Sequence, residues 1–244
     1  MKIKVLYEDK DVLVIDKPSG ILVHPDQKSE GETVLGIFSK EYPKLEIVHR
    51  LDKETSGVLI LAKNKKVHEF LKNQFQKRTV KKTYIAVVNG WPKNDHGIID
   101  KPIGRSPSDF RRRLAGRGAR GEMREAITEY KVLKRFTAPC VQNFSSCALP
   151  RVRGGTLGDK NFKHTAPFTY LEIKPKTGRT HQIRVHMKYL NYPVAYDSLY
   201  NPKGVCPNGL ERLALHAKSI EFENLKGKVI KVESPVPKEF EKLI

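Results

Sequence analysis

The sequence predicts an α+β fold in which helices and loops pack on a mixed, mainly antiparallel β-sheet. Two observations support this fold class. Short runs of apolar or alternating residues, typical of strands, outnumber the stretches with helical spacing. The helical stretches fall irregularly between these strands, so the regular strand–helix alternation of a parallel α/β sheet is missing. No shift in composition divides the 244 residues, and we therefore expect a single domain.

The first elements are predicted to be short strands and one short helix. Residues 2–7 and 11–15 form a hairpin pattern around a charged turn. Residues 21–25 form a brief strand that ends in proline. Thr33 can cap a short helix with its hydroxyl, and this helix must end before Pro43.

A strongly apolar strand follows at residues 58–62, and its lack of charge predicts that it is buried. Asn64 can then cap a helix. The inward side chains of that helix recur with helical spacing and are Val67, Phe70, Leu71 and Phe75. Residues 83–88 form the next strand, which ends at Asn89 and Gly90.

The second half supplies the remaining predicted strands and one more helix. The strands are residues 126–133, 169–174, 213–217 and 229–232. The helix runs from about residue 180 to residue 190 and turns Ile183, Met187 and Leu190 inward. A short amphipathic piece closes the chain.

Two segments show little periodicity and are predicted to be long surface loops. Residues 101–124 are basic and rich in Gly and Arg. Residues 137–167 form an insertion with three prolines and a Gly-Gly pair. Long loops in compact domains are usually functional or disordered, and the sequence does not decide between these for residues 137–167.

The charge of the chain indicates its partner. The formal net charge is +19 and the pI is near 9.8. Residues 63–82 hold eight Lys or Arg against one acid, and residues 101–124 hold eight against two. A polyanion is the natural partner of such surfaces, and nucleic acid is the first expectation. A generally basic, solvated surface is the alternative.

The sequence also indicates the compartment. The N-terminal residues contain no apolar signal segment, and no run approaches the ~20 apolar residues that a membrane span requires. Cys140, Cys147 and Cys206 match neither a disulfide framework nor a zinc pattern, so we expect free thiols in a reducing compartment. A soluble, cytoplasmic protein without membrane contact is therefore expected.

Asp52 is the leading candidate for chemistry. It lies in residues 49–57, HRLDKETSG, directly before the buried strand. A carboxylate there can act as a nucleophile or a general base. The alternative is a turn aspartate that bonds nearby main-chain N–H groups. Arg50, or Arg184 far down the chain, could keep Asp52 ionised by placing an opposite charge beside it.

A second polar group occupies residues 177–186, TGRTHQIRVH, at a predicted strand-to-helix junction. Arg184 lies between two apolar residues, and a charge that points inward there needs a partner. His181 and His186 are five residues apart, whereas two zinc ligands on one helical face are four apart. We therefore expect no metal site.

Tyr84 is the third candidate site residue. Tyr84 stands in an apolar strand and fits two roles, a core aromatic or a platform on which a base stacks for ~1–3 kcal/mol. No glycine-rich phosphate loop supports ATP or a dinucleotide. Ser56, His49 and Asp52 lack the Gly-x-Ser-x-Gly elbow of a serine hydrolase.

Five motifs occur along the chain in a specific order. They are DKPSG with VHP in residues 16–25, HRLDKETSG in 49–57, KTYIA in 82–86, TGRTHQIRVH in 177–186 and LHA in 215–217. In this order they resemble the motifs of the RluA-type pseudouridine synthases, which are RNA-modifying isomerases. The resemblance covers roughly residues 5–90, 125–135 and 169–240. One departure is Tyr196, which precedes Asp197 where relatives usually have glycine.

The resemblance implies a catalytic cleft across the middle of the sheet and a role for each motif. Asp52 would attack the target uridine at ribose C1′ or base C6, and the detached uracil would rotate and rejoin through C5. Arg184 would pair with Asp52, and Tyr84 would stack on the uracil. Arg50 would fill the space that the flipped base leaves. No cofactor or metal is needed, because the isomerisation has no net redox or hydrolytic change.

The resemblance also implies the substrate, a specific uridine in structured ribosomal or transfer RNA, and we expect a monomeric enzyme. RNA contacts are expected from two sets of basic residues: His49, Arg50, Arg179 and His181 in the motifs, and Arg111, Arg112 and Arg113 in the basic loop. Because the match begins at residue 5, we expect no separate N-terminal RNA-binding domain.

Two rival interpretations belong to other functional classes. A non-catalytic RNA-binding module with the same fold would tolerate loss of Asp52, Tyr84 or Arg184, yet all three are present. A generic DNA-binding protein would need a recognition helix with base-reading side chains, and the sequence offers no convincing one.

Overall fold

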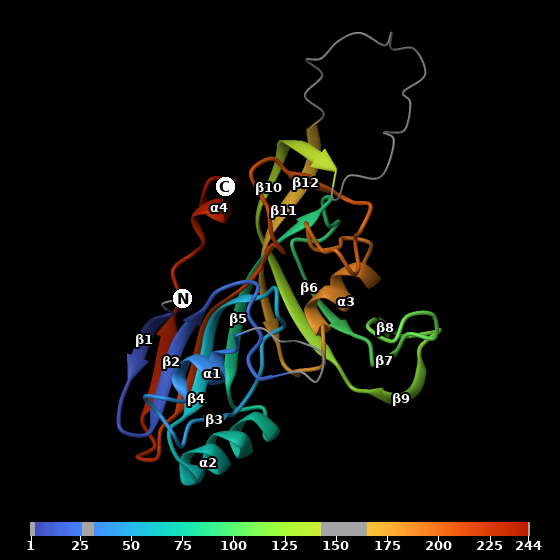
Figure 1. Ribbon diagram of the computed structural model, residues 1–244. Coiled ribbons are helices and arrows are strands. Elements are labelled where there is room, and N and C mark those ends of the chain that lie inside the picture. The colour runs from blue at the N-terminus through green and yellow to red at the C-terminus, as the bar shows by residue number, and fades with distance from the viewer. Residues whose placement is uncertain (1–2, 26–31, 143–164, 244) are drawn as a thin grey trace, which may run out of the picture.

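One large sheet runs through the molecule (Figure 1). The computed structural model of the chain describes residues 3–25, 32–142 and 165–243. The strand order is β1-β2-β4-β13-β5-β11-β10-β12, with β3 on β4, β14 on β13 and β6 on β10. The strands are β1 (Lys4–Glu8), β2 (Val12–Lys17), β3 (Glu46–Ile47), β4 (Ser56–Ala62), β5 (Lys81–Asn89), β6 (His96–Asp100), β10 (Ile127–Gln142), β11 (Thr165–Pro175), β12 (Val205–Pro207), β13 (Leu215–Glu223) and β14 (Val229–Glu233).

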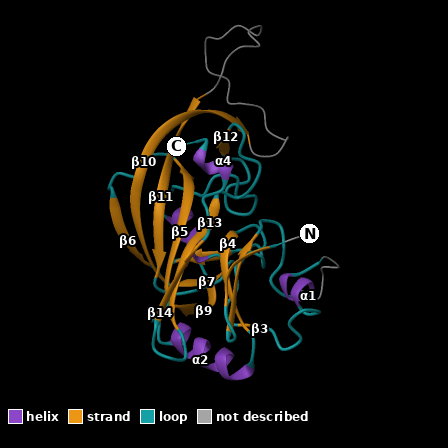
Figure 2. Cartoon of the chain, turned by 90° about the vertical axis from the view of Figure 1, so that its left-hand side faces the viewer, coloured by secondary structure: helices purple, strands orange, loops and turns teal. Residues whose placement is uncertain are grey.

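The strand directions confirm a mixed, mainly antiparallel sheet. Among the described residues, β4 and β13 form the one parallel pair, and the other neighbouring strands are antiparallel. Figure 2 shows the long strands β10 and β11 curving away from β4 and β14 toward the opposite end of the molecule. The sheet is therefore long and strongly bent.

Helices cover both faces of β4, which explains its apolar sequence. The helices are α1 (Val34–Phe38), α2 (Lys65–Gln76), α3 (Gln182–Tyr189) and α4 (Lys238–Glu241). Leu59 and Leu61 pack in the cluster that contains α1, whereas Val58 and Ile60 pack in the cluster that contains α2. No described helix has the length and apolar character that crossing a lipid bilayer requires.

Both predicted helix caps are confirmed. Thr33 and Asn64 each accept a main-chain N–H from the first turn, at 3.1 and 3.0 Å. α3 begins at Gln182, two residues after the expected start. Its cap is His181, which has a left-handed main chain with a φ of 57° and forms no side-chain cap bond.

Two of the sequence predictions are corrected by the structure. Residues 21–25 form no strand, because Leu22 makes only an isolated bridge with Thr33. Residues 101–124 were expected to be a loop but contain a small sheet of order β8-β7-β9. Its strands are β7 (Ile103–Arg105), β8 (Arg113–Ala115) and β9 (Arg120–Arg124). We call residues 103–124 the arm, which projects to the right of the main sheet in Figure 1.

The expected insertion at residues 137–167 is partly strand. β10 continues to Gln142 and β11 begins at Thr165, and the two strands pair up to the partners Pro139 and Thr165. The rest of the insertion, residues 143–164, lies outside the described residues.

Gly57 allows β4 to approach β13 directly after the loop that carries Asp52. It pairs with Ala217 in the parallel contact and has a φ of 108°. A Cβ at Gly57 would overlap the main chain of Ala217. Only glycine combines this backbone conformation with so close an approach. The contact fixes the start of β4 and therefore the end of the Asp52 loop.

We expect Gly57→Ala to lower the free energy of unfolding by at least about 3 kcal/mol, because it adds overlap with Ala217 to backbone strain. Gly227→Ala is the matched control. Gly227 has a φ of 74° and open space around it, so only the strain of ~1–2 kcal/mol remains. Urea unfolding of both variants measures the difference, and equal losses would contradict the close-approach argument.

Candidate active site

A cavity of about 620 Å³ lies beside the parallel contact of β4 and β13. Its walls come from the loop before β4, the end of α2, the start of β5 and the turn from β11 into α3. The predicted site residues outside the arm all line it, and they are His49, Arg50, Asp52, Tyr84, Arg179, His181 and Arg184. The fold thus brings together three motifs that are far apart in the sequence.

A buried lysine that the sequence reasoning did not single out braces the Asp52 loop. Lys17 is fully buried at the end of β2. Its Nζ donates to the carbonyls of Pro18, Ile21 and Lys53 at 2.9, 2.8 and 3.0 Å. Burial lowers the pKa of Lys17 to about 8, and the negative charge of Asp52 opposes this shift. The DKPSG motif therefore fixes the main chain of the Asp52 loop through Lys17.

Arg184 of α3 is a buried charge placed between two carboxylates. The side chain is 3% exposed. Its Nε and Nη2 donate to the two carboxylate oxygens of Asp197, both at 2.8 Å. Its Nη1 lies 3.5 Å from Oδ2 of Asp52 and 3.7 Å from Oε2 of Glu54. Burial acts to lower the pKa of Arg184, but the hydrogen bonds and charge of Asp197 outweigh it and raise the pKa.

Asp197 is the site residue whose role the sequence reasoning missed. It is fully buried and lies behind Arg184, outside the cavity lining. Its Oδ1 also accepts the main-chain N–H groups of Leu199 and Tyr200 at 3.0 and 2.9 Å. Its only signal in the sequence is an acid after an apolar run, a pattern too common to indicate a partner. The structure shows that Asp197 aims Arg184 at Asp52.

Tyr84 of β5 is both part of the core and part of the cavity wall. It lines the cavity, and it also packs against two of the apolar clusters. Burial and the negative charge of Asp52 raise the pKa of Tyr84. The phenol is therefore neutral at physiological pH and faces the same space as Asp52.

His49 and Arg50 are adjacent but have different surroundings. The ring of His49 stacks on Phe75 with centroids 4.7 Å apart, and its Nε2 accepts the main-chain N–H of Ile60 at 3.2 Å. Burial and the charge of Lys82 lower the pKa of His49 to about 3, so the ring is neutral. His49 thus ties the loop to α2 and β4, whereas Arg50 is exposed at the cavity.

The turn from β11 into α3 contributes Arg179 and His181. Arg179 is held by its Nε, which donates to the carbonyl of Glu125 at 2.9 Å. His181 reaches the carboxylate of Asp52, with its Nε2 4.0 Å from Oδ1. Arg184 and His181 therefore approach Asp52 on different oxygens.

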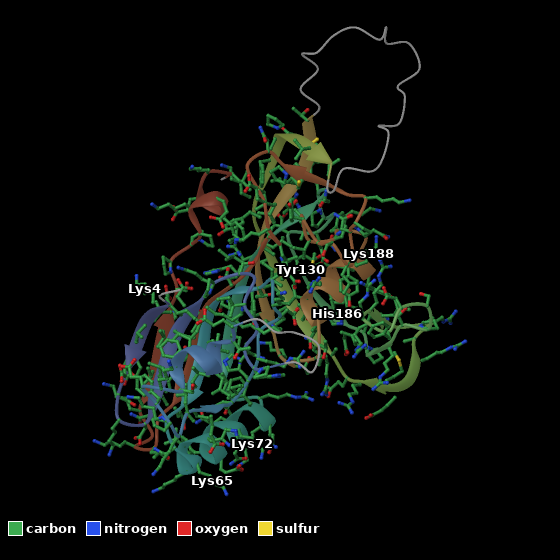
Figure 3. The ribbon with its side chains drawn as sticks, viewed as in Figure 1. Lys4, Lys65, Lys72, Tyr130, His186 and Lys188 are labelled. Carbon is green, nitrogen blue, oxygen red and sulfur yellow. The ribbon has the colours of Figure 1, made fainter. Side chains whose placement is uncertain are left out.

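The side chain of His186 is fully buried and does not line the cavity. Its Nδ1 lies 2.8 Å from the hydroxyl of Thr128, and its Nε2 donates to the carbonyl of Lys101 at 2.9 Å. Figure 3 labels it on α3. Across the described residues, no three His, Cys, Asp or Glu side chains gather as metal ligands do.

The arm arginines lie outside the cavity lining. Arg111 pairs with Asp109 at 2.9 Å, and Nε of Arg112 lies 3.6 Å from the same carboxylate. The main-chain N–H of Arg113 donates to the hydroxyl of Tyr200 at 2.9 Å. Any contact that these side chains make with a ligand would therefore be at some distance from Asp52.

We expect the two carboxylates around Arg184 to differ in their effect on stability. Asp197→Asn should lower the free energy of unfolding by about 3–5 kcal/mol, because it leaves a buried cation without its main partner. Asp52→Asn should change it by less than about 1 kcal/mol, because Asp52 is 17% exposed and Asp197 stays in place. Urea unfolding of both variants measures the two losses of unfolding free energy. A larger loss for Asp52→Asn than for Asp197→Asn would contradict the assignment of Asp197 as the main partner of Arg184.

Comparison with known protein sequences agrees with the resemblance. A family model described as RNA pseudouridylate synthase matches residues 11–189. The Uncharacterized RNA pseudouridine synthase YlyB of Bacillus subtilis (strain 168) is 36% identical over 255 residues, which cover 100% of this chain and 72% of the relative. Ribosomal large subunit pseudouridine synthase D of Xanthomonas campestris pv. campestris is 36% identical over 260 residues, which cover 99% of this chain and 68% of the relative.

Solved structures agree with the fold. Human RNA Pseudouridylate Synthase Domain Containing 4 superposes with a TM-score of 0.68 at 26% identity, over 98% of this chain and 90% of that one. Human RNA Pseudouridylate Synthase Domain Containing 1 gives a TM-score of 0.71 at 23% identity, over 97% and 84%. The family model, the relatives and the five ordered motifs lead to one conclusion: the chain belongs to the RNA pseudouridylate synthase family of isomerases, as an RluA-type member.

Proposed function

We propose that Asp52 is the nucleophile with which this chain converts specific uridines to pseudouridine in structured ribosomal or transfer RNA. The observation that carries the assignment is the arrangement around Arg184. Its charge is already balanced by Asp197, so its third nitrogen, 3.5 Å from Asp52, is available to orient a second carboxylate toward the cavity.

The reaction needs only groups that the cavity offers. The bond between uracil N1 and ribose C1′ breaks, a bond between C5 and C1′ forms, C5 loses a proton and N1 gains one. Asp52 carries the intermediate through a covalent bond to C1′ or to C6. Because nothing is oxidised or hydrolysed overall, we propose an enzyme that works without metal or cofactor.

The neighbours of Asp52 receive separate roles in this proposal. Tyr84 stacks on the uracil, and because its hydroxyl stays protonated it is suited to donate a hydrogen bond to the base rather than to take the proton from C5. Arg50, exposed at the cavity, occupies the space that the flipped nucleotide leaves. Flipping costs a few kcal/mol, which phosphate contacts from basic residues around the cavity offset.

Basic groups near the cavity supply these phosphate contacts. Lys72, Lys82 and Arg179 line the cavity, and Figure 3 shows Lys72 on α2. We propose that the arm, with Arg111, Arg112 and Arg113, extends this surface. Several relatives bear the name Ribosomal large subunit pseudouridine synthase D. Ribosomal RNA is therefore the first substrate to test, in a cytoplasmic and monomeric enzyme.

We expect Asp52→Asn to abolish tritium release from RNA that carries 5-tritiated uridine, because the amide cannot form the covalent bond. RNA binding should remain close to that of the wild-type protein. Glu54→Gln is the matched control. It removes a carboxylate 3.7 Å from the same Arg184 nitrogen and should retain most of the activity.

Three outcomes of this experiment are informative. Release by Asp52→Asn near the wild-type rate would refute Asp52 as the nucleophile. Loss of activity in both variants would assign Asp52 to charge balance rather than to bond formation. A wild-type protein that binds RNA but releases no tritium from any RNA tested would favour the non-catalytic RNA-binding module.

We expect Arg111→Ala combined with Arg112→Ala and Arg113→Ala to weaken RNA binding and to flatten its dependence on salt. Each lost phosphate contact to single-stranded RNA should reduce the slope of log K against log salt by ~0.7. The control is Lys226→Ala with Lys228→Ala, in the hairpin between β13 and β14, far from the arm in Figure 1. Equal slopes for the wild-type protein and the arm variant would place the arm away from RNA.

A further inference from the structure

His181 faces the second oxygen of the Asp52 carboxylate. Arg184 approaches Oδ2 at 3.5 Å, whereas Nε2 of His181 lies 4.0 Å from Oδ1. The His181 side chain is 18% exposed and lines the same cavity. Catalytic hydrogen bonds are often long before substrate binds and tighten in the substrate complex. Asp52 therefore has a cationic donor on one oxygen and an imidazole beside the other.

The other ring nitrogen of His181 is held by a buried tyrosine. Its Nδ1 lies 2.9 Å from the hydroxyl of Tyr200, and the two rings meet edge to face at 5.6 Å. Tyr200 is 5% exposed and packs with Ile103 of the arm and Val185 of α3. Its hydroxyl accepts the main-chain N–H of Arg113 at 2.9 Å. Burial raises the pKa of Tyr200 to about 12, so the hydroxyl keeps its proton.

These contacts select which nitrogen of His181 carries the proton. Burial lowers the pKa of His181, and the negative charge of Asp52 opposes this shift without cancelling it, so the ring is neutral near pH 7. The Tyr200 hydroxyl accepts from Arg113, and its own proton can be donated to Nδ1. The ring proton then lies on Nε2, toward Asp52. The other tautomer would set a lone pair against the carboxylate, which is repulsive.

We propose that His181 and Tyr200 are positioning residues for Asp52. Tyr200 holds His181 as its Nε2–H tautomer, and this N–H orients Oδ1 of Asp52 while Arg184 holds Oδ2. The inference rests on the proposed function, in which Asp52 is the nucleophile. Two donors on two oxygens fix the plane of the carboxylate, so that a single geometry meets the target uridine.

The main chain at His181 supports a role for its side chain. Its φ of 57° is left-handed, and it caps α3 without a side-chain hydrogen bond to the helix. Glycine adopts this conformation without strain, and asparagine, aspartate and histidine are the other residue types enriched there. Residues held in this region concentrate at functional sites. The backbone at His181 therefore disfavours most side chains, and glutamine lacks the enrichment that asparagine has.

NMR of protein labelled with ¹⁵N at histidine tests the tautomer directly. We expect the wild-type His181 ring to show the Nε2–H pattern, and loss of the signal in His181→Gln identifies it. Tyr200→Phe keeps the ring and removes the hydroxyl, so the resonance of the unprotonated Nδ1 should shift as this nitrogen loses its hydrogen-bond donor. A wild-type His181 protonated on Nδ1, or an unchanged Nδ1 resonance in Tyr200→Phe, overturns the proposal.

Kinetics of two amide variants distinguish a hydrogen bond from the His181 side chain from an effect of the backbone conformation at residue 181. The amide nitrogen of glutamine can take the place of Nε2, whereas that of asparagine takes the place of Nδ1. His181→Asn should lower kcat for tritium release about tenfold with little change in KM, which corresponds to one lost hydrogen bond. His181→Gln should recover most of this loss. Backbone preference predicts the opposite order, so an Asn variant as active as the Gln variant refutes the positioning role.

The outcomes for Asp52 and for His181 can be told apart. If Asp52→Asn keeps its tritium release, the proposed function is wrong, whichever tautomer His181 has. If Asp52→Asn is inactive but the His181 variants keep the wild-type kcat, Asp52 stands as the nucleophile and His181 has no positioning role.

Discussion

The buried ion pair between Arg184 and Asp197 is the interaction on which the rest of the site depends. A guanidinium that is 3% exposed needs a partner, and Asp197 meets two of its nitrogens while main-chain N–H groups hold the same carboxylate. With this inner partner in place, Arg184 can approach Asp52 without depending on it. Asp52 can then take part in bond making while the structure keeps its charge balance.

Asp52 itself is held through the main chain of its loop. Before Glu54, the Nζ of Lys17 donates to the carbonyl of Lys53. After Glu54, Gly57 pairs closely with Ala217 of β13. Neither contact touches the carboxylate of Asp52. These contacts fix the main chain of the loop, while the carboxylate of Asp52 faces the cavity. This arrangement suits the proposed nucleophile, which needs one well-defined position.

The sequence predicted those parts of the molecule that depend on local pattern. The apolar run of β4, the caps at Thr33 and Asn64 and the meeting of the motif residues at one cavity all followed from it. The arm did not, because short strands joined by glycine turns carry no periodicity. Lys17 and Asp197 were missed for another reason. A lysine is expected on the surface, and only tertiary structure shows that three carbonyls or a guanidinium surround a buried charge.

The main chain bears strain on both sides of the central ion pair. His181, three residues before Arg184, and Tyr196, directly before Asp197, each have a φ of 57°. Such a conformation costs ~1–3 kcal/mol at a bulky residue and persists only where its surroundings impose it. At Tyr196 the constraint comes from the preceding residue, Ala195. Its main-chain N–H donates to the carbonyl of Val87, and its carbonyl accepts the N–H of Ala214. Glycine in place of Tyr196 would relieve the strain. The sheet therefore holds the carboxylate of Asp197 at the guanidinium, and the backbone adopts the conformation that this position requires.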